Sequence, residues 1–206
     1  MILDRPARWV LDHIETWRSV AVWPLIMTYR LTDQQAVIDA DCEKWADLLW
    51  LAPDQRYRLL GRFLFAFAEF RSVYYHRLAS GNPAGALAAR LAAHVWPGVP
   101  GLDLSGTPIG PGLFISHGQG TILSAERIGA NLQVHQGVTV GWDYRGDHRP
   151  VIGDDVFIGA GAKVLGAITI GAGARIGANA VVVCDVPAGA TAVGVPARIL
   201  TAGRSC

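Results

Sequence analysis

Apolar residues recur along this chain with two different periods, one in each half. In residues 7–95 they return every three or four positions, as on one face of an α-helix. From Ile109 onward an aliphatic residue returns every six positions or a multiple of six, once one extra residue before Ile128 is allowed for. Seven pairs mark this hexad: Ile109-Gly110, Ile128-Gly129, Val140-Gly141, Ile152-Gly153, Ile158-Gly159, Ile170-Gly171 and Ile176-Gly177.

The six-residue period fits neither an α-helix nor an isolated strand. In a helix each interior Gly would cost about 1 kcal/mol relative to Ala, and a strand alternates with a period of two. A parallel β-helix accommodates the pattern, because each hexad forms one short strand and a turn, and successive rungs stack their aliphatic residues into a buried column. We therefore predict that residues 99–206 form a β-helix with a short C-terminal tail.

The first half is expected to be a separate α-helical domain, residues 1–98. The junction is marked by three prolines and three glycines in residues 97–108, and the resulting fold class is α+β. Apolar spacing and capping residues predict four helices. They cover residues 7–30, a segment capped by Asp33, a longer segment that Asp54 opens and that runs through Tyr74, and an Ala-rich segment from Asn82-Pro83 to the residue before Trp96.

Charge and cysteine content narrow the partners and the compartment. The formal net charge of +1 provides no basic surface field for a nucleic acid or an anionic membrane. The three cysteines, Cys42, Cys184 and Cys206, cannot form a closed disulfide set and lack metal-binding spacing. No apolar run approaches the roughly 20 residues of a membrane span. We expect a cytoplasmic protein that acts on small molecules.

One polar segment interrupts the hexads. Residues 142–149 lie between Val140 and Ile152 and are too polar for a buried rung, although the phase of the repeat continues on both sides. This segment is predicted to be a loop that protrudes from the coil. Because functional residues are often placed on loops of a rigid scaffold, it is a candidate site.

Three motifs connect the chain to a known family. With the hexads, the segments Ile115-Ser116-His117-Gly118-Gln119-Gly120, Gly146-Asp147-His148-Arg149-Pro150 and Gly194-Val195-Pro196-Ala197-Arg198 make the chain resemble the serine O-acetyltransferase branch of the hexapeptide-repeat acyltransferases. The resemblance implies a left-handed coil, homotrimers with active sites between neighbours, a dimer of trimers as a further possibility, acetyl-CoA as donor, and a role in cysteine biosynthesis. It implies no metal.

The resemblance also implies direct transfer, with His117 as general base and Asp103 as its orienting carboxylate. The residue types fit, because an imidazole titrates near neutral pH and a carboxylate on its second nitrogen fixes the tautomer. Asp103 matches the family Asp if one residue of the intervening turn is deleted. Rungs are about 4.8 Å apart, so we expect Asp103 on about the same face as His117, one rung away.

The remaining site residues also follow from the family. Asp54, Ser116, His148 and Arg149 are expected to bind the acceptor, and Arg149 suits a carboxylate because Arg binds that group through two hydrogen bonds. Glu126 is interpreted as a surface residue, and His135 has no assigned role. Backbone amides and basic side chains are expected to bind CoA at Gly141, Ala160, Gly161, Lys163 and Arg198.

Three departures from the family bear on the acceptor and the partners. Ser116 stands where the branch usually has Asp, so an acceptor ammonium loses one counter-charge. His148 and Arg149 stand in the order opposite to that of the family. Both changes favour a saccharide or another hydroxylated metabolite as the alternative to L-serine. Relatives that dock into cysteine synthase end in Ile, whereas this chain ends in Cys206, which argues against that partner.

Two other classes of function compete with an acyltransferase. A β-helix metalloenzyme would need three histidines around a zinc ion, but His117, His135 and His148 are separated by 18 and 13 residues and form no close pair. A non-catalytic assembly module would use the helical half to join trimers. The presence of both Asp103 and His117 argues against this second alternative.

Overall fold

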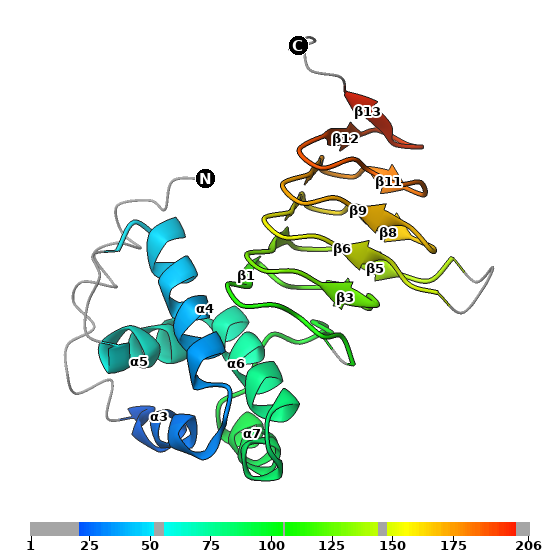
Figure 1. Cartoon of the computed structure of the whole chain (residues 1–206). Coiled ribbons are helices and arrows are strands. Elements are labelled where there is room, and N and C mark those ends of the chain that lie inside the picture. The colour runs from blue at the N-terminus through cyan, green and yellow to red at the C-terminus, as the bar shows by residue number, and fades with distance from the viewer. Residues whose placement is uncertain (1–20, 52–55, 105, 144–147, 201–206) are drawn as a thin grey trace. The chain divides into compact units, whose positions relative to one another are not determined.

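The computed structural model describes residues 21–51, 56–104, 106–143 and 148–200 of the chain, with the side chains of residues 56–58 not described (Figure 1). The chain divides into two compact units, residues 1–98 and residues 99–206.

Helices make up the described part of the first unit. They are α3 (Trp23–Thr28), followed by a short 3-10 helix (Tyr29–Leu31), then α4 (Gln35–Leu48), α5 (Arg56–Ala66), α6 (Ala68–Ser80) and α7 (Pro83–Val95) (Figure 1). Their core contains an aromatic cluster in which the ring of Trp45 lies 5.2 Å from that of Phe70 and 5.5 Å from that of Phe67, between centroids. Aromatic surface buried in this way dominates the packing of a small helical unit.

The long helix predicted through Tyr74 is in fact two helices. Phe67 adopts extended dihedral angles (φ −121°, ψ 115°) and separates α5 from α6. The Arg71 guanidinium donates hydrogen bonds to the carbonyls of Leu64 (2.8 Å) and Phe65 (3.2 Å) in the last turn of α5. The carbonyl groups at the end of α5 therefore accept hydrogen bonds from a side chain of the next helix. Helical periodicity does not reveal this pairing.

The capping predictions had different outcomes. α7 starts at Asn82-Pro83, as predicted, and the structure shows Asn82 as its N-cap, with the side chain accepting a hydrogen bond from the Gly85 backbone N–H at 2.8 Å. Asp33 does not cap α4, because Gln34 occupies the N-cap position, and the Asp33 carboxylate instead accepts the backbone N–H of Asn82 at 3.2 Å. Residues 7–20 and Asp54, which belong to the other predicted helix starts, lie outside the described residues.

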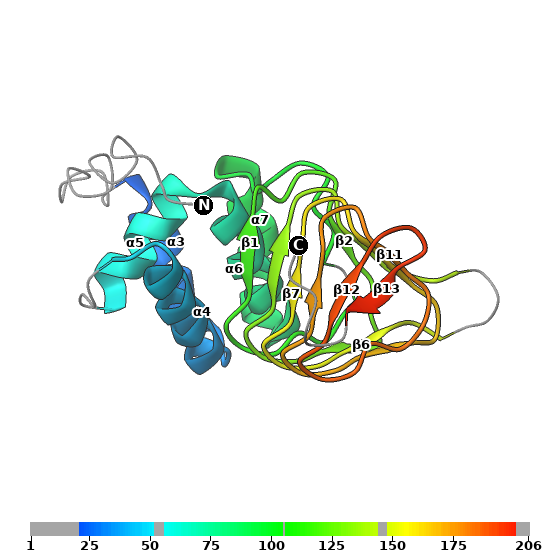
Figure 2. The same ribbon diagram turned by 90° about the horizontal axis from the view of Figure 1, so that it is seen from above.

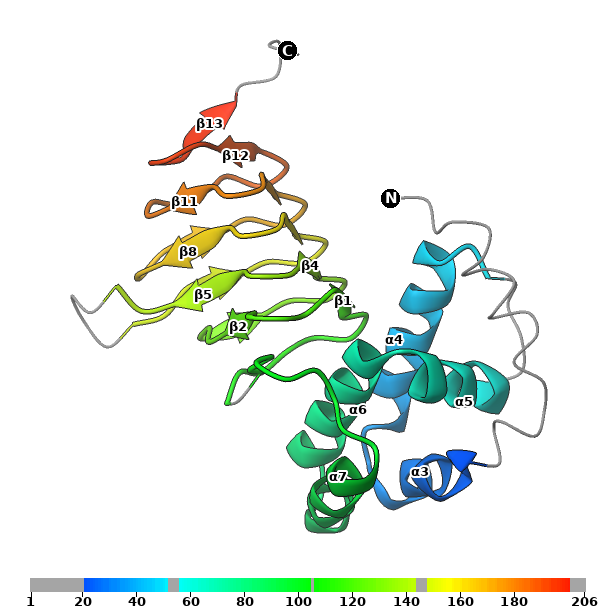
Figure 3. The same ribbon diagram turned by 180° about the vertical axis from the view of Figure 1, so that it is seen from behind.

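The second unit is a parallel β-helix whose strands form three faces (Figures 1 and 3). From above, successive rungs are stacked along one axis (Figure 2). The six-stranded face comprises β1 (Phe114–Ser116), β4 (Gln133–His135), β7 (Phe157–Ile158), β10 (Arg175–Ile176), β12 (Thr191–Val193) and β13 (Arg198–Leu200). The four-stranded face comprises β2 (Ile122–Leu123), β5 (Thr139–Gly141), β8 (Lys163–Leu165) and β11 (Val181–Val182). The three-stranded face comprises β3 (Arg127–Ile128), β6 (Val151–Ile152) and β9 (Thr169–Ile170).

The hexad residues form the core of this coil. Ile128, Ile152 and Ile170 are register partners on successive rungs, and each is at most 1% exposed. A Cβ atom built on Gly153 would lie 2.7 Å from the backbone nitrogen of Ala172 on the next rung. The Gly of this hexad is therefore needed because the backbones of neighbouring rungs approach closely there.

The predicted loop is confirmed at the interruption of the hexads. The chain leaves the four-stranded face after Gly141 and returns to the coil at Val151 (Figure 3). The rungs continue on either side, because β5 pairs with β8 and β6 pairs with β9.

Candidate active site

His117 lies in an enlarged corner of the β-helix. Five residues, 117–121, separate Ser116 on the six-stranded face from Ile122 on the four-stranded face, whereas three residues, 136–138, separate their register partners on the next rung. His117 is exposed and has a left-handed backbone conformation, with φ +54°. Asn131, Asp155 and Asn179 adopt the same conformation in other turns between strands, so it is a feature of the corners of this coil.

The buried Thr121 closes this corner. Its backbone N–H donates to the carbonyl of Gly118 at 3.2 Å, and its hydroxyl donates to the carbonyl of His135 at 3.1 Å. The Thr121 carbonyl in turn accepts the backbone N–H of Asp103 at 2.9 Å. Thr121 thus connects the His117 corner to the neighbouring rung on each side, a role that the sequence did not indicate.

The register of Asp103 differs from the expected one. Asp103 forms a parallel bridge with Ile122, the first residue after the corner, and not with His117 itself. The two additional residues of the corner account for the difference, because they separate His117 from the strand that continues the rung. Asp103 lies at the start of the four-stranded face, beside the residue that directly follows the His117 corner.

His135 lies next to this corner on the following rung. It is the register partner of Ser116, and its ring packs edge-on against Phe157 at 5.3 Å between centroids. Partial burial lowers the pKa of His135, and the nearby His117 lowers it further. His135 is therefore neutral near pH 7 and adds no positive charge beside His117.

Two of the predicted CoA-binding residues lie at the same corner of the coil as His117, on a later rung. Ala160 and Gly161 occupy the equivalent corner two rungs above His117, and the Gly161 N–H donates to the carbonyl of Gln136 at 2.9 Å. Lys163 begins the next strand, and its ammonium donates to the carbonyl of Gly137 at 2.5 Å. The fold therefore brings His117, Ala160, Gly161 and Lys163 to one edge of the coil.

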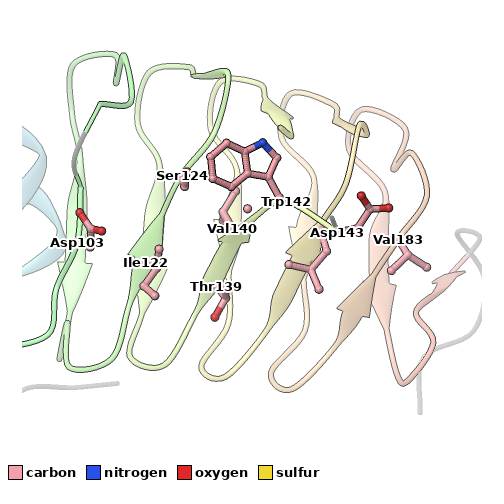
Figure 4. Close-up of a pocket in the computed structure, with 10 residues that line it drawn as sticks. Asp103, Ile122, Ser124, Thr139, Val140, Trp142, Asp143 and Val183 are labelled. Carbon is pink, nitrogen blue, oxygen red and sulfur yellow. The ribbon is translucent and has the colours of Figure 1, made fainter. Parts of the chain in front are cut away.

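A cavity of about 720 Å³ lies on the four-stranded face (Figure 4). Two of the predicted site residues, Asp103 and Gly141, line it, while His117, Lys163 and Arg198 are not among its lining residues. Its lining consists of Asp103, Ile122, Ser124, Thr139, Val140, Gly141, Trp142, Asp143, Leu165 and Val183. Ile122, Leu165 and Val183 lie on different rungs of this face, so the cavity has an apolar floor that runs along the coil, whereas the side chain of Val140 is buried in the core.

The loop residues occupy two different environments. His148 is exposed, whereas the Arg149 guanidinium lies 5.2 Å from the centroid of the Trp142 ring and donates to the hydroxyl of Ser124 at 3.4 Å. The Nε atom of Arg149 is buried and has no hydrogen-bond partner among the described residues. Sequence reasoning did not select Trp142 or Ser124, although Trp142 is the one tryptophan in residues 99–206.

Ser116 and Arg198 lie apart from the cavity. Ser116 is half-buried on β1, and Arg198 is exposed on β13, the strand that runs antiparallel to β12. Asp54 lies outside the described residues. Glu126 is exposed, as expected for a surface residue.

The described part of the chain contains neither a metal-binding cluster nor a membrane-spanning helix. Within it, no group of three or more His, Cys, Asp or Glu side chains is placed to hold a metal ion. None of the described helices combines the length and the apolarity needed to cross a membrane.

Comparison with known proteins yields consistent matches. Residues 149–184 match the bacterial transferase hexapeptide (six repeats) family. A serine acetyltransferase of Helicobacter pylori strain J99 is 48% identical over 102 residues, which cover 48% of this chain and 60% of the relative. The chain thus spans less than two thirds of that relative's length.

Solved structures extend the match to both units. The serine acetyltransferase of Neisseria gonorrhoeae in complex with serine has a TM-score of 0.64 and 32% identity, over 93% of this chain and 86% of the other. The serine acetyltransferase of Brucella abortus in complex with Coenzyme A has a TM-score of 0.62 and 26% identity, over 86% and 72%. The predicted fold class, including the left hand of the coil, is confirmed.

Proposed function

This chain belongs to the serine acetyltransferase family of hexapeptide-repeat transferases, and we propose that it transfers the acetyl group of acetyl-CoA to the hydroxyl of L-serine. The observation that carries the proposal is the enlarged corner that contains His117 and leads directly to Ile122, which lines a cavity together with its bridge partner Asp103. The complexes of the two structural relatives, one with serine and one with Coenzyme A, support the two substrates. Such a reaction would feed cysteine biosynthesis.

The proposed mechanism is direct transfer. The imidazole of His117 accepts the proton of the serine hydroxyl while that oxygen forms a bond to the thioester carbonyl carbon. Backbone N–H groups stabilise the resulting oxyanion. The carbon–sulfur bond then breaks, and the departing thiolate takes the proton from the imidazolium, which leaves O-acetylserine and CoA. Asp103 would orient the imidazole from the rung beside it.

Donor and acceptor would bind on different elements. We assign the donor to the four-stranded face, with backbone contacts at Gly141, Ala160 and Gly161 and with Lys163 and Arg198 near its phosphates. The acceptor would contact Ser116, Asp54 and the exposed loop residue His148. In this assignment the carboxylate of serine is bound by His148.

The test is a CoA-release assay with purified protein, acetyl-CoA and L-serine. We expect His117→Asn to lower kcat/KM by about 100-fold to 10,000-fold, the usual contribution of a general base. The matched control is His94→Asn, since His94 is an exposed histidine of α7 whose ring Nδ1 lies 2.7 Å from the carbonyl of Arg90. Normal turnover by His117→Asn would refute the mechanism.

A saccharide or another hydroxylated metabolite is the second candidate acceptor. Ser116 favours it, because a neutral hydroxyl here offers no charge to an acceptor ammonium. A panel of sugars and alcohols in the same assay separates the candidates. Release of CoA with a sugar but not with serine would show that the sugar, and not serine, is the acceptor.

We further propose that the active enzyme is a homotrimer. Within one chain the loop with His148 leaves the four-stranded face at the edge opposite the His117 corner. The face lies between the two, and a width of about five extended residues corresponds to roughly 15 Å. A neighbouring copy is needed to bring such a loop to His117, and a three-sided coil suits threefold closure. The exposed stripe Leu87, Leu91 and Val95 on α7 supports further pairing of two trimers.

Mixed trimers test the shared site. Neither His117→Asn nor His148→Ala subunits should be active alone, but an equal mixture assembled together should regain about a quarter of wild-type activity, because one interface in four combines both intact residues. No recovery in mixed trimers of correct mass would contradict a shared site.

A cytoplasmic location is proposed as well. The described cysteines, Cys42 and Cys184, are not joined in a disulfide, which suits a reducing compartment. Cys206, on which the argument against cysteine synthase as a partner rests, lies outside the described residues.

A further inference from the structure

Trp142 forms a wall of the cavity on the four-stranded face. Its side chain is 44% exposed, although it belongs to a loop that starts directly after β5. The indole lies over the strand that carries Val140, with Ser124 on one side and Asp143 on the other (Figure 4). A large aromatic side chain exposed beside an apolar cavity offers binding surface that folding itself has not used.

Arg149 holds this indole from the far end of the loop. Its guanidinium contacts the ring at 5.2 Å and reaches Ser124, a second lining residue, at 3.4 Å. The guanidinium therefore bridges the two sides of the cavity wall. Among aromatic side chains, the indole gives the strongest cation–π contact, so the guanidinium favours this orientation of the Trp142 ring.

The cavity floor matches an aliphatic ligand that lies along the coil. Ile122, Leu165 and Val183 contribute aliphatic side chains to it from the first, third and fourth of four successive rungs, which are about 4.8 Å apart. The second rung contributes Thr139 and Gly141, because the side chain of Val140 is buried in the core of the coil. Asp103 lines the end of the cavity beside the His117 corner. An extended acyl thioester arm fits these features, because its methylene and methyl groups suit the floor and its reactive end would reach the catalytic edge.

We propose that Trp142 is a donor-binding residue that packs its indole against the pantetheine arm of acetyl-CoA, and that Arg149 is a positioning residue for this indole. The inference rests on the proposed acetyltransferase function and deepens it. It gives Arg149 a role different from the one expected from the sequence, which was to bind the carboxylate of the acceptor. The acceptor carboxylate is then left to His148.

The first experiment measures binding of two probes by calorimetry, so that it does not depend on turnover. Trp142→Gly should weaken binding of CoA about ten-fold and leave binding of adenosine 3′,5′-bisphosphate, which lacks the pantetheine arm, within twofold. Trp142→Phe keeps an aromatic wall and should bind CoA within threefold of wild type. Trp23→Phe, an exposed tryptophan of the helical unit, is the matched control.

The result for the nucleotide probe decides what the indole touches. Equal loss of affinity for CoA and for the bisphosphate would show that Trp142 contacts the nucleotide, and would overturn the assignment. Unchanged CoA binding by a folded Trp142→Gly variant would overturn it as well. If that variant fails to fold, unchanged CoA binding by Trp142→Leu, which removes the ring but keeps an apolar side chain, has the same meaning.

The second experiment separates the two roles of Arg149 by steady-state kinetics. Arg149→Ala should raise KM for acetyl-CoA about three-fold to ten-fold, leave KM for serine within twofold, and add nothing to the effect of Trp142→Gly in the double variant. A rise of more than five-fold in KM for serine would overturn the positioning role. The matched control is Arg175→Ala, which removes a similar contact, 4.5 Å from the Phe157 ring, on the six-stranded face.

The proposed function and this inference fail in different ways. A wild-type protein that binds CoA, with the loss of affinity expected for Trp142→Gly, but that acetylates no acceptor would refute the proposed function alone. An active wild-type enzyme whose Trp142→Gly and Arg149→Ala variants keep normal KM for acetyl-CoA would refute this inference alone.

Discussion

The buried ion pair between Asp41 of α4 and Arg77 of α6 should contribute heavily to the stability of the helical unit. The Asp41 and Arg77 side chains are 1% and 3% exposed. Arg77 Nε donates to one carboxylate oxygen at 2.8 Å, and its Nη2 donates to the other at 3.1 Å. The contact is therefore a two-bond, fork-shaped pair out of reach of solvent.

Asp41→Asn removes the charge of this carboxylate and keeps its shape. The guanidinium then stays buried without a counter-charge, which costs about 3–5 kcal/mol of unfolding free energy. An exposed ion pair would contribute only about 0–1 kcal/mol. Since whole domains are stable by about 5–15 kcal/mol, this single substitution should remove a large share of the stability.

Urea unfolding followed by tryptophan fluorescence measures the effect in the relevant unit, because six of the seven tryptophans lie in residues 1–98. Asp47→Asn is the matched control, since Asp47 is exposed on the same helix, and it should stay within about 0.5 kcal/mol of wild type. The double variant Asp41→Leu/Arg77→Met should recover most of the loss, because an apolar pair leaves no buried charge. A loss below about 1 kcal/mol for Asp41→Asn would refute the reasoning.

Three further predictions concern packing, protonation and the site. Gly153→Ala should destabilise the β-helix by about 1–3 kcal/mol, because the new methyl group meets backbone atoms of the next rung, while Gly141→Ala, with nothing within 4 Å, should melt near the wild-type temperature. Burial, and then a neighbouring arginine, lower the pKa of His76 from 6.5 to about 4, so the unfolded chain binds the extra proton first and the unfolding free energy should fall as pH is lowered from about 6.5 to about 4. An equally steep pH dependence in His76→Gln would contradict this assignment. Thr121→Val should cost about 1–3 kcal/mol and lower kcat, because a buried carbonyl loses its hydrogen bond; unchanged thermal stability would exclude the proposed closing role of this hydroxyl.

Local pattern was sufficient for the elements whose side chains all point to one core. The hexads predicted the β-helix because each aliphatic residue is buried by the same residue type one rung away, as Ile128, Ile152 and Ile170 are. The start of α7 at Asn82-Pro83 was predicted because its signals are local: Pro83 lies in the first turn, and Asn82 accepts its hydrogen bond from Gly85, three residues away. The division of α5 from α6 was not predicted, because the group that satisfies the break, Arg71, belongs to the following helix.

The same distinction applies to the site. The sequence by itself determined the coil and the loop that interrupts it, since both follow from spacing along the chain, and it indicated the candidate base His117 through the resemblance to a known family. Only the tertiary structure decided that Asp103 pairs with Ile122, and that Arg149 contacts Trp142 and Ser124. The physical reason is register. A corner longer by two residues changes which residues of neighbouring rungs are paired. Contacts between rungs therefore depend on how the rungs are aligned in the coil and not on sequence separation.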